Sequence, residues 1–258
     1  MGHVKPKKHL GQHFLLDQNI ARKIASSLTA SSQGTVIEIG AGTGVLTQYL
    51  IDAHDHFVAM DVDRESVDFL KSTYIRRQEK ILLADFLKVD LAAYASPLQI
   101  VGNLPYNISS QIFFRIYDER SSVSEAVCMI QKEVAERLAS SHGSKSYGIL
   151  SVLLQAFFDI ELLFAVPPHV FDPPPKVQSA VIRLRRNETS ALSCDEKLFR
   201  RVVKEGFGKR RKTLRNALKN LNLPAALVSH PEFDLRAEQL SVEDFVLLTT
   251  KIQKSWKP

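Results

Sequence analysis

The sequence has few cysteines, and its histidines form no cluster. Cys128 and Cys194 are the two cysteines in 258 residues, and neither has a Cys or His nearby at the spacing of metal ligands. The eight histidines are scattered along the chain, so no zinc pattern emerges. Sequence alone leaves a disulfide open, but we interpret both cysteines as packing residues in a reducing, cytoplasmic setting.

Long hydrophobic runs are missing as well. No apolar stretch approaches the ~20 residues that span a bilayer, and residues 1–8 carry lysines with no apolar segment behind them, unlike a secretory signal. Hydrophobic residues still make up 45% of the chain, enough for one large α/β domain plus a small unit. We therefore expect a cytoplasmic monomer without a membrane partner.

Acidic residues are scarce in two zones of a chain whose net charge is +6. Residues 1–16, the N-terminal arm, contain lysines and no acid. Between Lys197 and Lys219 there are ten Lys or Arg and one acid, Glu205. This distribution favours a polyanionic partner such as nucleic acid, although a basic run can also be a solvated helix face.

Strand-like and helix-like segments alternate along the chain up to residue 186. We expect strands at 35–39, 56–60, 81–84, 98–102, 125–130, 158–165 and 177–185. We expect helices at 16–28, from about 45, and at 65–74, 109–118, 131–139 and 146–157. The order predicts an α/β fold with a mostly parallel sheet covered on both faces. A polar stretch follows, so we divide the chain into domains at 1–188 and 189–258, the second helical.

The glycine loop is the first candidate binding element. Gly40, Gly42 and Gly44 lie between a predicted strand and a predicted helix, where glycines let the backbone turn tightly and approach a ligand. The spacing is GxGxG, not the GxGxxG of dinucleotide-binding proteins. So short a loop favours a ligand without phosphate; the alternative is a turn that binds nothing.

Two acids follow the next predicted strands. Asp61 lies 21 residues after Gly40, where a carboxylate can accept hydrogen bonds from both ribose hydroxyls. Asp85 ends the following strand and could accept a hydrogen bond from the N–H of an adenine amine, with Phe86 alongside the ring. Either acid alone is more often a solvated loop residue, but three strand ends in this order indicate a nucleoside-shaped site.

The fourth predicted strand ends in the hexapeptide at residues 102–107. The Asn103 side-chain oxygen and the Leu104 carbonyl could both accept N–H bonds from an adenine amine, favouring a pyramidal nitrogen whose lone pair faces a methyl donor. Pro105 fixes the turn, and Tyr106 offers a face on which a flipped base can stack. The alternative is a proline-containing turn without a ligand. Catalysis here would rest on positioning and electrostatics.

These motifs, with several others in the same order, resemble the ribosomal RNA adenine dimethyltransferases. The matching segments are residues 11–15, 38–44, 103–107, 131–134, 145–148 and 166–177. The resemblance covers about residues 5–220. It implies a Rossmann-like class I methyltransferase fold with a small all-helical C-terminal domain, and S-adenosylmethionine as the cofactor.

The resemblance also implies a substrate. The Leu104 form of the tetrapeptide and the segments at 145–148 and 173–176 favour the small-subunit enzymes over the macrolide-resistance methylases. We therefore expect N6,N6-dimethylation of two adjacent adenines near the 3′ end of 16S rRNA, on the immature 30S subunit. A ribosome-assembly factor that binds small subunits is a second hypothesis. An NAD-dependent dehydrogenase fits poorly, because the glycine spacing is wrong.

Further site residues come from the resemblance alone. Gln12, His13 and Leu15 would lie over the methionine end of the cofactor, with His13 where the family usually has Asn. A side-chain contact there would put cofactor affinity in doubt, whereas a backbone contact would not. Phe171 would form a second aromatic wall of the adenine pocket; otherwise it is a core aromatic before a proline-rich loop.

The basic segment at residues 209–215 is the candidate RNA-binding element. Its phosphate contacts would supply affinity and salt dependence but little choice of sequence. The residues expected to make these contacts are Lys209, Arg210, Arg211, Lys212 and Arg215.

Overall fold

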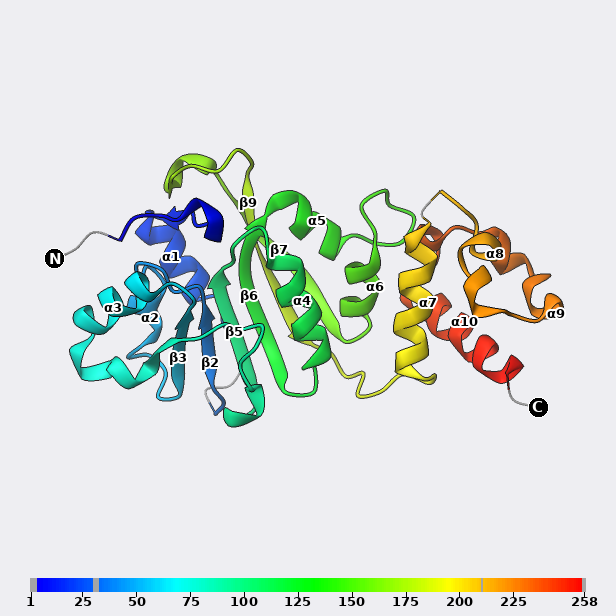
Figure 1. Cartoon of the computed structure of the whole chain (residues 1–258), viewed down its shortest axis with the longest axis horizontal. Coiled ribbons are helices and arrows are strands. Elements are labelled where there is room, and N and C mark those ends of the chain that lie inside the picture. Colours follow the sequence, from blue (N-terminus) through cyan, green and yellow to red (C-terminus); the bar gives the residue numbers. More distant parts are fainter. Residues whose placement is uncertain (1–3, 30–32, 210, 257–258) are drawn as a thin grey trace. The chain divides into compact units, whose positions relative to one another are not determined.

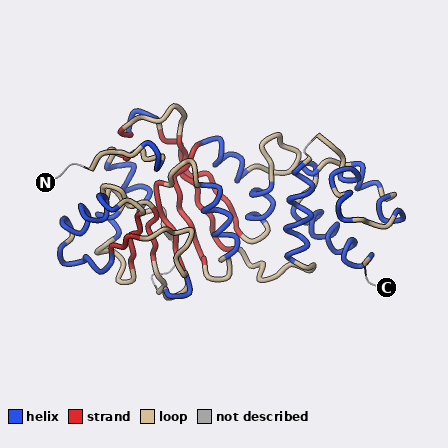
Figure 2. The backbone as a smooth tube through the Cα atoms, in the orientation of Figure 1, coloured by secondary structure: helices blue, strands red, loops and turns tan. Residues whose placement is uncertain are grey.

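The computed structural model describes residues 4–29, 33–209 and 211–256. It contains two compact units. The first comprises the chain up to Ala135 together with Asp159–Arg186, and the second comprises Glu136–Phe158 together with the chain from Asn187 onward. Figure 1 labels their elements, and Figure 2 separates helices from strands.

A seven-stranded sheet with the order β4-β3-β2-β5-β6-β9-β7 forms the centre of the first unit. The strands are β2 (Val36–Ile39), β3 (Phe57–Asp61), β4 (Ile81–Leu83), β5 (Leu98–Asn103), β6 (Val123–Gln131), β7 (Phe158–Val166) and β9 (Ser179–Arg186). The pairs β4–β3, β3–β2, β2–β5 and β5–β6 are parallel, whereas β6–β9 is antiparallel. The predicted mostly parallel sheet is confirmed, and its first strands lie within a few residues of their expected positions.

Helices alternate with these strands along the chain. They are α1 (Gln18–Ala25), α2 (Thr47–Leu50), α3 (Arg64–Thr73), α4 (Ser109–Asp118) and α5 (Lys132–Ala139), which runs across the boundary between the units. Short 3-10 segments lie at Lys8–Leu10, Ile75–Lys80, Leu91–Ala93 and Pro168–Val170. The helix expected from about residue 45 is thus a single turn, α2.

Both faces of the sheet are buried, as expected for parallel strands flanked by helices. Val36 and Val101 pack in the same hydrophobic cluster as Ile24 of α1. Ile37 and Ile100, which alternate with them and so point to the opposite face, are equally buried. Figure 1 shows helix α4 in front of the sheet, running roughly along the direction of β6.

A second, two-stranded sheet was not anticipated from the sequence. Strand β1 (Phe14–Leu15) pairs antiparallel with β8 (Phe171–Asp172), so that Phe14 lies opposite Asp172 and Leu15 opposite Phe171. The N-terminal arm is thereby held by a segment more than 150 residues away in the chain.

The second unit is built from helices: α6 (Ile149–Gln155), α7 (Glu196–Gly208), α8 (Leu214–Ala217), α9 (Ala225–Val228) and α10 (Val242–Ser255). Further 3-10 turns lie at Lys219–Leu221, Pro231–Asp234 and Ala237–Gln239. From Asn187 on, the described residues contain no strand, which agrees with the predicted helical C-terminal region.

The division of the chain differs from the expected one at residue 188. The structure assigns Glu136–Phe158 to the helical unit, although the sequence analysis placed it in the first domain. Side-chain packing explains the difference. The ring of Phe207 in α7 lies 6.0 Å from that of Tyr147 and 5.9 Å from that of Phe245 in α10, so the segment joins the core of the helical unit.

The two cysteines are free thiols. Cys128 is fully buried in β6, and burial raises the pKa of its thiol to about 12, consistent with its interpretation as a packing residue. In the part of the chain that the structure describes, no helix is long and apolar enough to cross a bilayer.

Candidate active site

The carboxyl ends of the parallel strands border one cleft in the first unit. The cleft encloses about 730 Å³ of space between the protein atoms when its open mouth is included. Most of the predicted site residues line it: Gln12, His13, Gly40, Gly42, Asp61, Asp85, Asn103, Leu104 and Tyr106. Leu15 instead lines an adjoining pocket of about 260 Å³ that shares Gly40, Gly42 and Asn103 with the cleft.

The glycine loop turns where side chains would not fit. Gly42 has φ of +55°, and a Cβ there would lie 3.0 Å from Cε1 of Phe14 in the arm. Gly44 has φ of +83°, and a Cβ there would lie 2.6 Å from Cδ2 of Leu70. Glycine adopts these conformations without steric cost. Gly42 therefore lets the arm approach the loop, whereas Gly44 serves packing against α3 and lines neither pocket.

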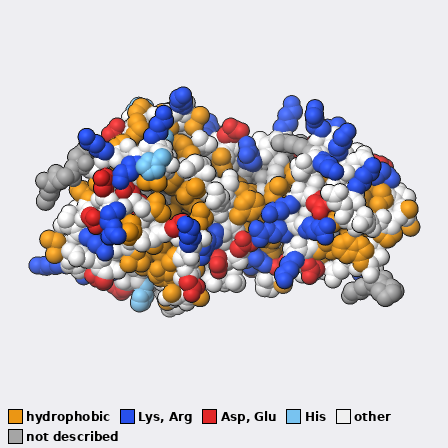
Figure 3. All heavy atoms as spheres, in the orientation of Figure 1, with side chains coloured by type: hydrophobic (Ala, Val, Ile, Leu, Met, Phe, Trp, Pro, Cys, Tyr) orange, Lys and Arg blue, Asp and Glu red, His pale blue; other side chains and the backbone are white. Residues whose placement is uncertain are grey.

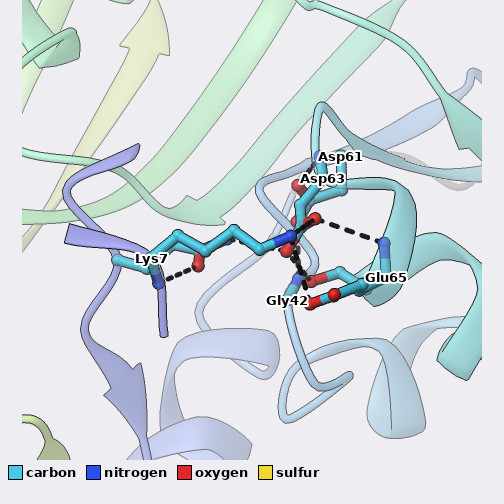
Figure 4. Close-up of polar contacts among 7 residues, drawn as sticks. Lys7, Gly42, Asp61, Asp63 and Glu65 are labelled. Carbon is cyan, nitrogen blue, oxygen red and sulfur yellow. Dashed lines mark hydrogen bonds and ion pairs between the residues drawn. The ribbon is translucent and has the colours of Figure 1, made fainter. Parts of the chain in front are cut away.

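Asp61, the last residue of β3, is tied to the glycine loop (Figure 4). Its Oδ2 accepts a hydrogen bond from the Gly42 N–H at 2.8 Å, and its Oδ1 accepts one from the Asp63 N–H at 2.8 Å. Burial raises the pKa of the Asp61 carboxyl above its usual value, and the two N–H donors offset only part of this rise. Each carboxylate oxygen has a second lone pair, so Asp61 can accept bonds from a ligand while it holds the loop.

Asp63 ties the N-terminal arm to the start of α3 (Figure 4). Nζ of Lys7 lies 2.5 Å from Oδ1 of Asp63 and 3.1 Å from Oε2 of Glu65. The side-chain amide of Gln12 accepts from the Lys7 N–H at 2.8 Å and donates to Asp63 at 3.5 Å. Burial alone would raise the pKa of Asp63, but the Lys7 ammonium and the other donors hold it below its usual value.

The sequence analysis missed this network, although one signal pointed to it. Asp63 stands directly before α3 and accepts a hydrogen bond from the Glu65 N–H at 3.2 Å, as a helix N-cap does. Asp63 lies two residues after Asp61, the predicted ribose ligand, so its position in the sequence already indicated that it could hold the end of the same strand. Gln12 lines the cleft as expected, but its side-chain amide braces the arm.

Asp85 and Phe86 follow β4 at the edge of the cleft. Oδ1 of Asp85 accepts a hydrogen bond from the Leu87 N–H at 3.0 Å, and Oδ2 lies 3.4 Å from Nζ of the exposed Lys88. The Phe86 ring is buried, with the Arg115 guanidinium 5.5 Å from its centroid. An acid and an apolar ring thus lie next to each other, the pairing that the sequence predicted for an adenine.

Asn103 ends β5, and its orientation is fixed from the arm. Its Nδ2 donates a hydrogen bond to the main-chain carbonyl of His13 at 2.8 Å. Because the amide nitrogen is engaged in this way, Oδ1 is the end of the side chain available to accept from a substrate amine. The Leu104 N–H bonds to the Met129 carbonyl at 3.0 Å, which anchors the following turn to β6.

The Tyr106 ring is held at two places. Its hydroxyl lies 2.5 Å from Oγ of Ser179, a fully buried residue at the start of β9. Its ring stacks on that of His13, with centroids 5.4 Å apart and planes inclined by 27°. Burial raises the pKa of the Tyr106 phenol, although the hydrogen bond with Ser179 lowers it. The sequence had suggested Tyr106 but not Ser179.

Phe171, the predicted second aromatic wall, does not reach the cleft. Its side chain is 3% exposed and packs in the hydrophobic cluster with Leu15 and Val170. The pairing of β1 with β8 accounts for this position, because it places Phe171 opposite Leu15. In this structure Phe171 is a core aromatic, and the ring that stacks on Tyr106 belongs to His13.

Glu38 is a buried acid beside the glycine loop. It is 1% exposed, and its Oε2 accepts a hydrogen bond from Oγ1 of Thr47 at 2.7 Å. Burial, with a smaller contribution from the Asp61 charge, raises the pKa of Glu38 to about 8. Glu38 is therefore largely protonated at neutral pH and adds little negative charge beneath the loop.

The basic segment lies in the helical unit, where Figure 3 shows Lys and Arg side chains gathered around α7. Lys209, Arg211 and Lys212 are exposed, whereas Arg210 lies outside the described residues. Arg215 is half-buried, and its guanidinium contacts Oδ1 of Asp234 at 2.7 and 3.1 Å. Arg215 is thus already paired, unlike a cation held ready for phosphate.

Comparison with known proteins agrees with the motifs. The family model described as ribosomal RNA adenine dimethylase matches residues 3–254. The ribosomal RNA small subunit methyltransferase A of Cytophaga hutchinsonii is 54% identical over 255 residues, covering 98% of this chain and 99% of the relative. The protein of the same name from Flavobacterium johnsoniae is 52% identical, covering 98% of each chain.

Solved structures show the same architecture. A dimethyladenosine transferase from Plasmodium falciparum matches with a TM-score of 0.81 and 25% identity, covering 94% of this chain and 98% of the other. The 23S rRNA methyltransferase ErmE matches with a TM-score of 0.69 and 24% identity, covering 92% and 99%, which shows the shared class I methyltransferase fold. The chain therefore belongs to the ribosomal RNA adenine dimethylase family and is a ribosomal RNA methyltransferase.

Proposed function

We propose that the protein dimethylates the exocyclic N6 amine of two adjacent adenines near the 3′ end of small-subunit (16S) rRNA, with S-adenosylmethionine as the methyl donor. One observation carries the proposal: a single cleft is lined by Gly42 and Asp61, by Asp85, and by the turn from Asn103 to Tyr106. The names of relatives about half identical to this chain support the small subunit as the substrate.

The residues of the cleft fit the nucleoside part of this cofactor. Asp61 keeps lone pairs for a ribose diol while its carboxylate holds the Gly42 N–H. Asp85 and the apolar Phe86 match the amine and the ring of an adenine. When bound, S-adenosylmethionine supplies an electrophilic methyl group. At Gly42 the positive φ and the Phe14 ring, 3.0 Å from where a Cβ would lie, exclude any side chain, so the arm can lie against the loop.

Asn103 and Tyr106 would act on the target adenine. The N6 lone pair is delocalised into the ring, so the amine is a weak nucleophile until its N–H bonds are held out of the ring plane. Oδ1 of Asn103 and the Leu104 carbonyl would accept these N–H bonds. Tyr106, held by Ser179, would stack on a base that is unpaired or flipped. The nitrogen gains a methyl group and releases a proton.

The basic segment would hold the RNA through phosphates, with Lys209, Arg211 and Lys212 as the exposed cations. The pairing of Arg215 with Asp234 makes it a weaker candidate than its neighbours. We further propose that the protein is a cytoplasmic monomer that acts during small-subunit biogenesis on the immature 30S particle.

Mass mapping of methylated adenines tests the proposal. Unmodified 16S rRNA, free or in immature 30S particles, is incubated with the protein and S-adenosylmethionine. We expect dimethyladenosine at two adjacent positions near the 3′ end. Methylation of large-subunit rRNA alone would contradict it and favour the activity for which ErmE is named.

An assembly factor in which methylation is secondary is the second hypothesis. The Asn103→Ala protein separates the two, because it should retain particle binding through the basic segment. If particles mature equally well with this variant, binding is the main role; if maturation fails while binding persists, methylation is.

A further inference from the structure

His13 joins the arm to the turn at Tyr106, which lines the cleft, and to the loop at Pro173, which follows β8. Its Nδ1 lies 2.7 Å from the carbonyl oxygen of Pro173, which follows β8, and its ring stacks on Tyr106 at 5.4 Å between centroids. Its main-chain carbonyl accepts the hydrogen bond from Asn103. We infer that the His13 side chain is a positioning residue for the target base, acting through Tyr106, rather than a ligand of the cofactor. The inference rests on the proposed function.

The hydrogen bond to Pro173 fixes the direction of the His13 ring. A carbonyl oxygen can only accept, so Nδ1 of His13 carries the proton in this contact. The bond holds the ring from one end while the stacking holds its plane, so the imidazole has a single orientation against Tyr106.

Tyr106 is thereby held from two sides. Ser179 fixes the phenol hydroxyl at 2.5 Å, and the His13 ring covers part of the phenol ring. A base stacks at a lower cost in entropy on an aromatic ring whose plane is already fixed. His13 therefore lowers the reorganisation that Tyr106 undergoes when an adenine arrives.

The contacts of His13 divide between its side chain and its backbone. The side chain touches Tyr106 and Pro173, whereas the backbone orients Asn103. An Asn at this position could keep the backbone contact but has no ring to stack. Among the described residues, the ring recorded as stacking on Tyr106 is that of His13, whereas Phe171 is buried in the core.

A set of variants measured in two assays tests the inference. His13→Asn removes the ring, and His13→Phe keeps a ring without the bond to Pro173. His9→Asn is the matched control, because His9 is an exposed histidine of the same arm. The assays are calorimetric binding of S-adenosylhomocysteine and single-turnover methylation of 16S rRNA at saturating cofactor.

We expect His13→Asn to bind S-adenosylhomocysteine within about twofold of the unaltered protein and to methylate about tenfold more slowly, the upper end of what an aromatic pair contributes. His13→Phe should recover part of the rate, and His9→Asn should behave normally. In a Tyr106→Ala background, His13→Asn should cause no further loss, because its effect runs through the missing ring.

Two results would overturn the inference. One is a tenfold weaker binding of S-adenosylhomocysteine by His13→Asn with an unchanged rate at saturation, which would make the side chain a cofactor ligand. The other is an equal loss of rate with and without Tyr106. If the unaltered protein methylates no adenine, the proposed function fails, and that outcome is distinct from both.

Discussion

The cleft and the basic segment differ in how their charged groups are placed: those at the cleft are buried and paired, whereas those of the segment are exposed. Asp61 in the cleft and Asp63 beside it are buried; Asp61 accepts bonds from backbone donors, and Asp63 pairs with Lys7. In the basic segment, Arg211 and Lys212 are exposed. A group with internal partners has a fixed direction and a local effect, whereas an exposed cation offers charge without direction. Changes in the cleft should therefore act on one step and be insensitive to salt, unlike changes in the segment.

The largest effect should come from Asn103→Ala. It removes an acceptor that the bond to His13 holds in place, so turnover should fall roughly 100- to 1000-fold, by analogy with the loss of one preorganised donor. RNA binding should hardly change, because phosphates supply most of the affinity. A monomethylated amine has one N–H left, so monomethyladenosine should accumulate. Near-normal dimethylation in single-turnover assays would show that the amine is not oriented by Asn103.

Glu38, the buried acid beside the glycine loop, should make the free energy of unfolding depend on pH, which the exposed charges should not do. Its pKa rises from 4.5 to about 8 on folding. Between these values the folded protein keeps a proton that the unfolded chain releases, so the free energy of unfolding falls as pH rises. Glu38→Gln, which imitates the protonated acid, should remove this fall. From pH 5 to pH 8 the free energy of unfolding of the variant should therefore rise by on the order of 3 kcal/mol relative to that of the unaltered protein. Denaturant unfolding at both pH values measures it.

The exposed Glu79 provides the control for this prediction. Glu79→Gln should leave the pH dependence as it is. A parallel decline of the Glu38→Gln and unaltered proteins with rising pH would mean that Glu38 is ionised in the folded state.

Asp61→Ala should weaken S-adenosylhomocysteine binding by about 1–3 kcal/mol, as expected for hydrogen bonds to a charged group. The loss should be the same at low and high salt, because the group is buried. Asp68→Ala, at an exposed position in α3, is the matched control. Calorimetry checks both, and tight binding of NAD by the unaltered protein would refute the cofactor assignment.

The smallest and most salt-dependent effect should come from Arg211→Ala combined with Lys212→Ala. RNA affinity should fall at low salt, and its logarithmic dependence on salt should flatten by up to about 1.5, as two phosphate contacts are lost. Cofactor binding should be untouched. Arg64→Ala with Arg76→Ala removes the same charge from exposed positions in the first unit. If both pairs change the slope equally, the effect is one of net charge, and the basic segment has no special role.

The sequence was most informative where function follows from strand order. Gly40, Asp61, Asp85 and Asn103 were each placed at the end of a strand by local patterns. Parallel strands bring their carboxyl ends to one edge of a sheet, and the cleft lies there. The periodicity of the strands was thus enough to predict which residues meet, without any knowledge of contacts.

Contacts between distant segments were beyond the reach of such patterns. Two-residue strands such as β1 and β8 have no measurable alternation, so their pairing left no trace in the sequence. Neither the burial of Phe171 nor the contact of Lys7 with Asp63 follows from local propensity, since both arise from where the arm lies. The pairing of Arg215 with Asp234 likewise removes a cation that charge counting treated as free.

The pairing of β1 with β8 also ties the cleft to the order in which the chain is synthesised. Leu15 leaves the ribosome long before its partner Phe171, and closing so long a loop costs entropy that local contacts do not. Until β8 exists, the arm has no strand to pair with, although β2, β3 and β5 can already form their ladders. In a nascent or truncated chain that stops before β8, the N-terminal arm is not held in place beside the glycine loop and Asp61. Competence to hold a ligand therefore arrives with the last strands to be made.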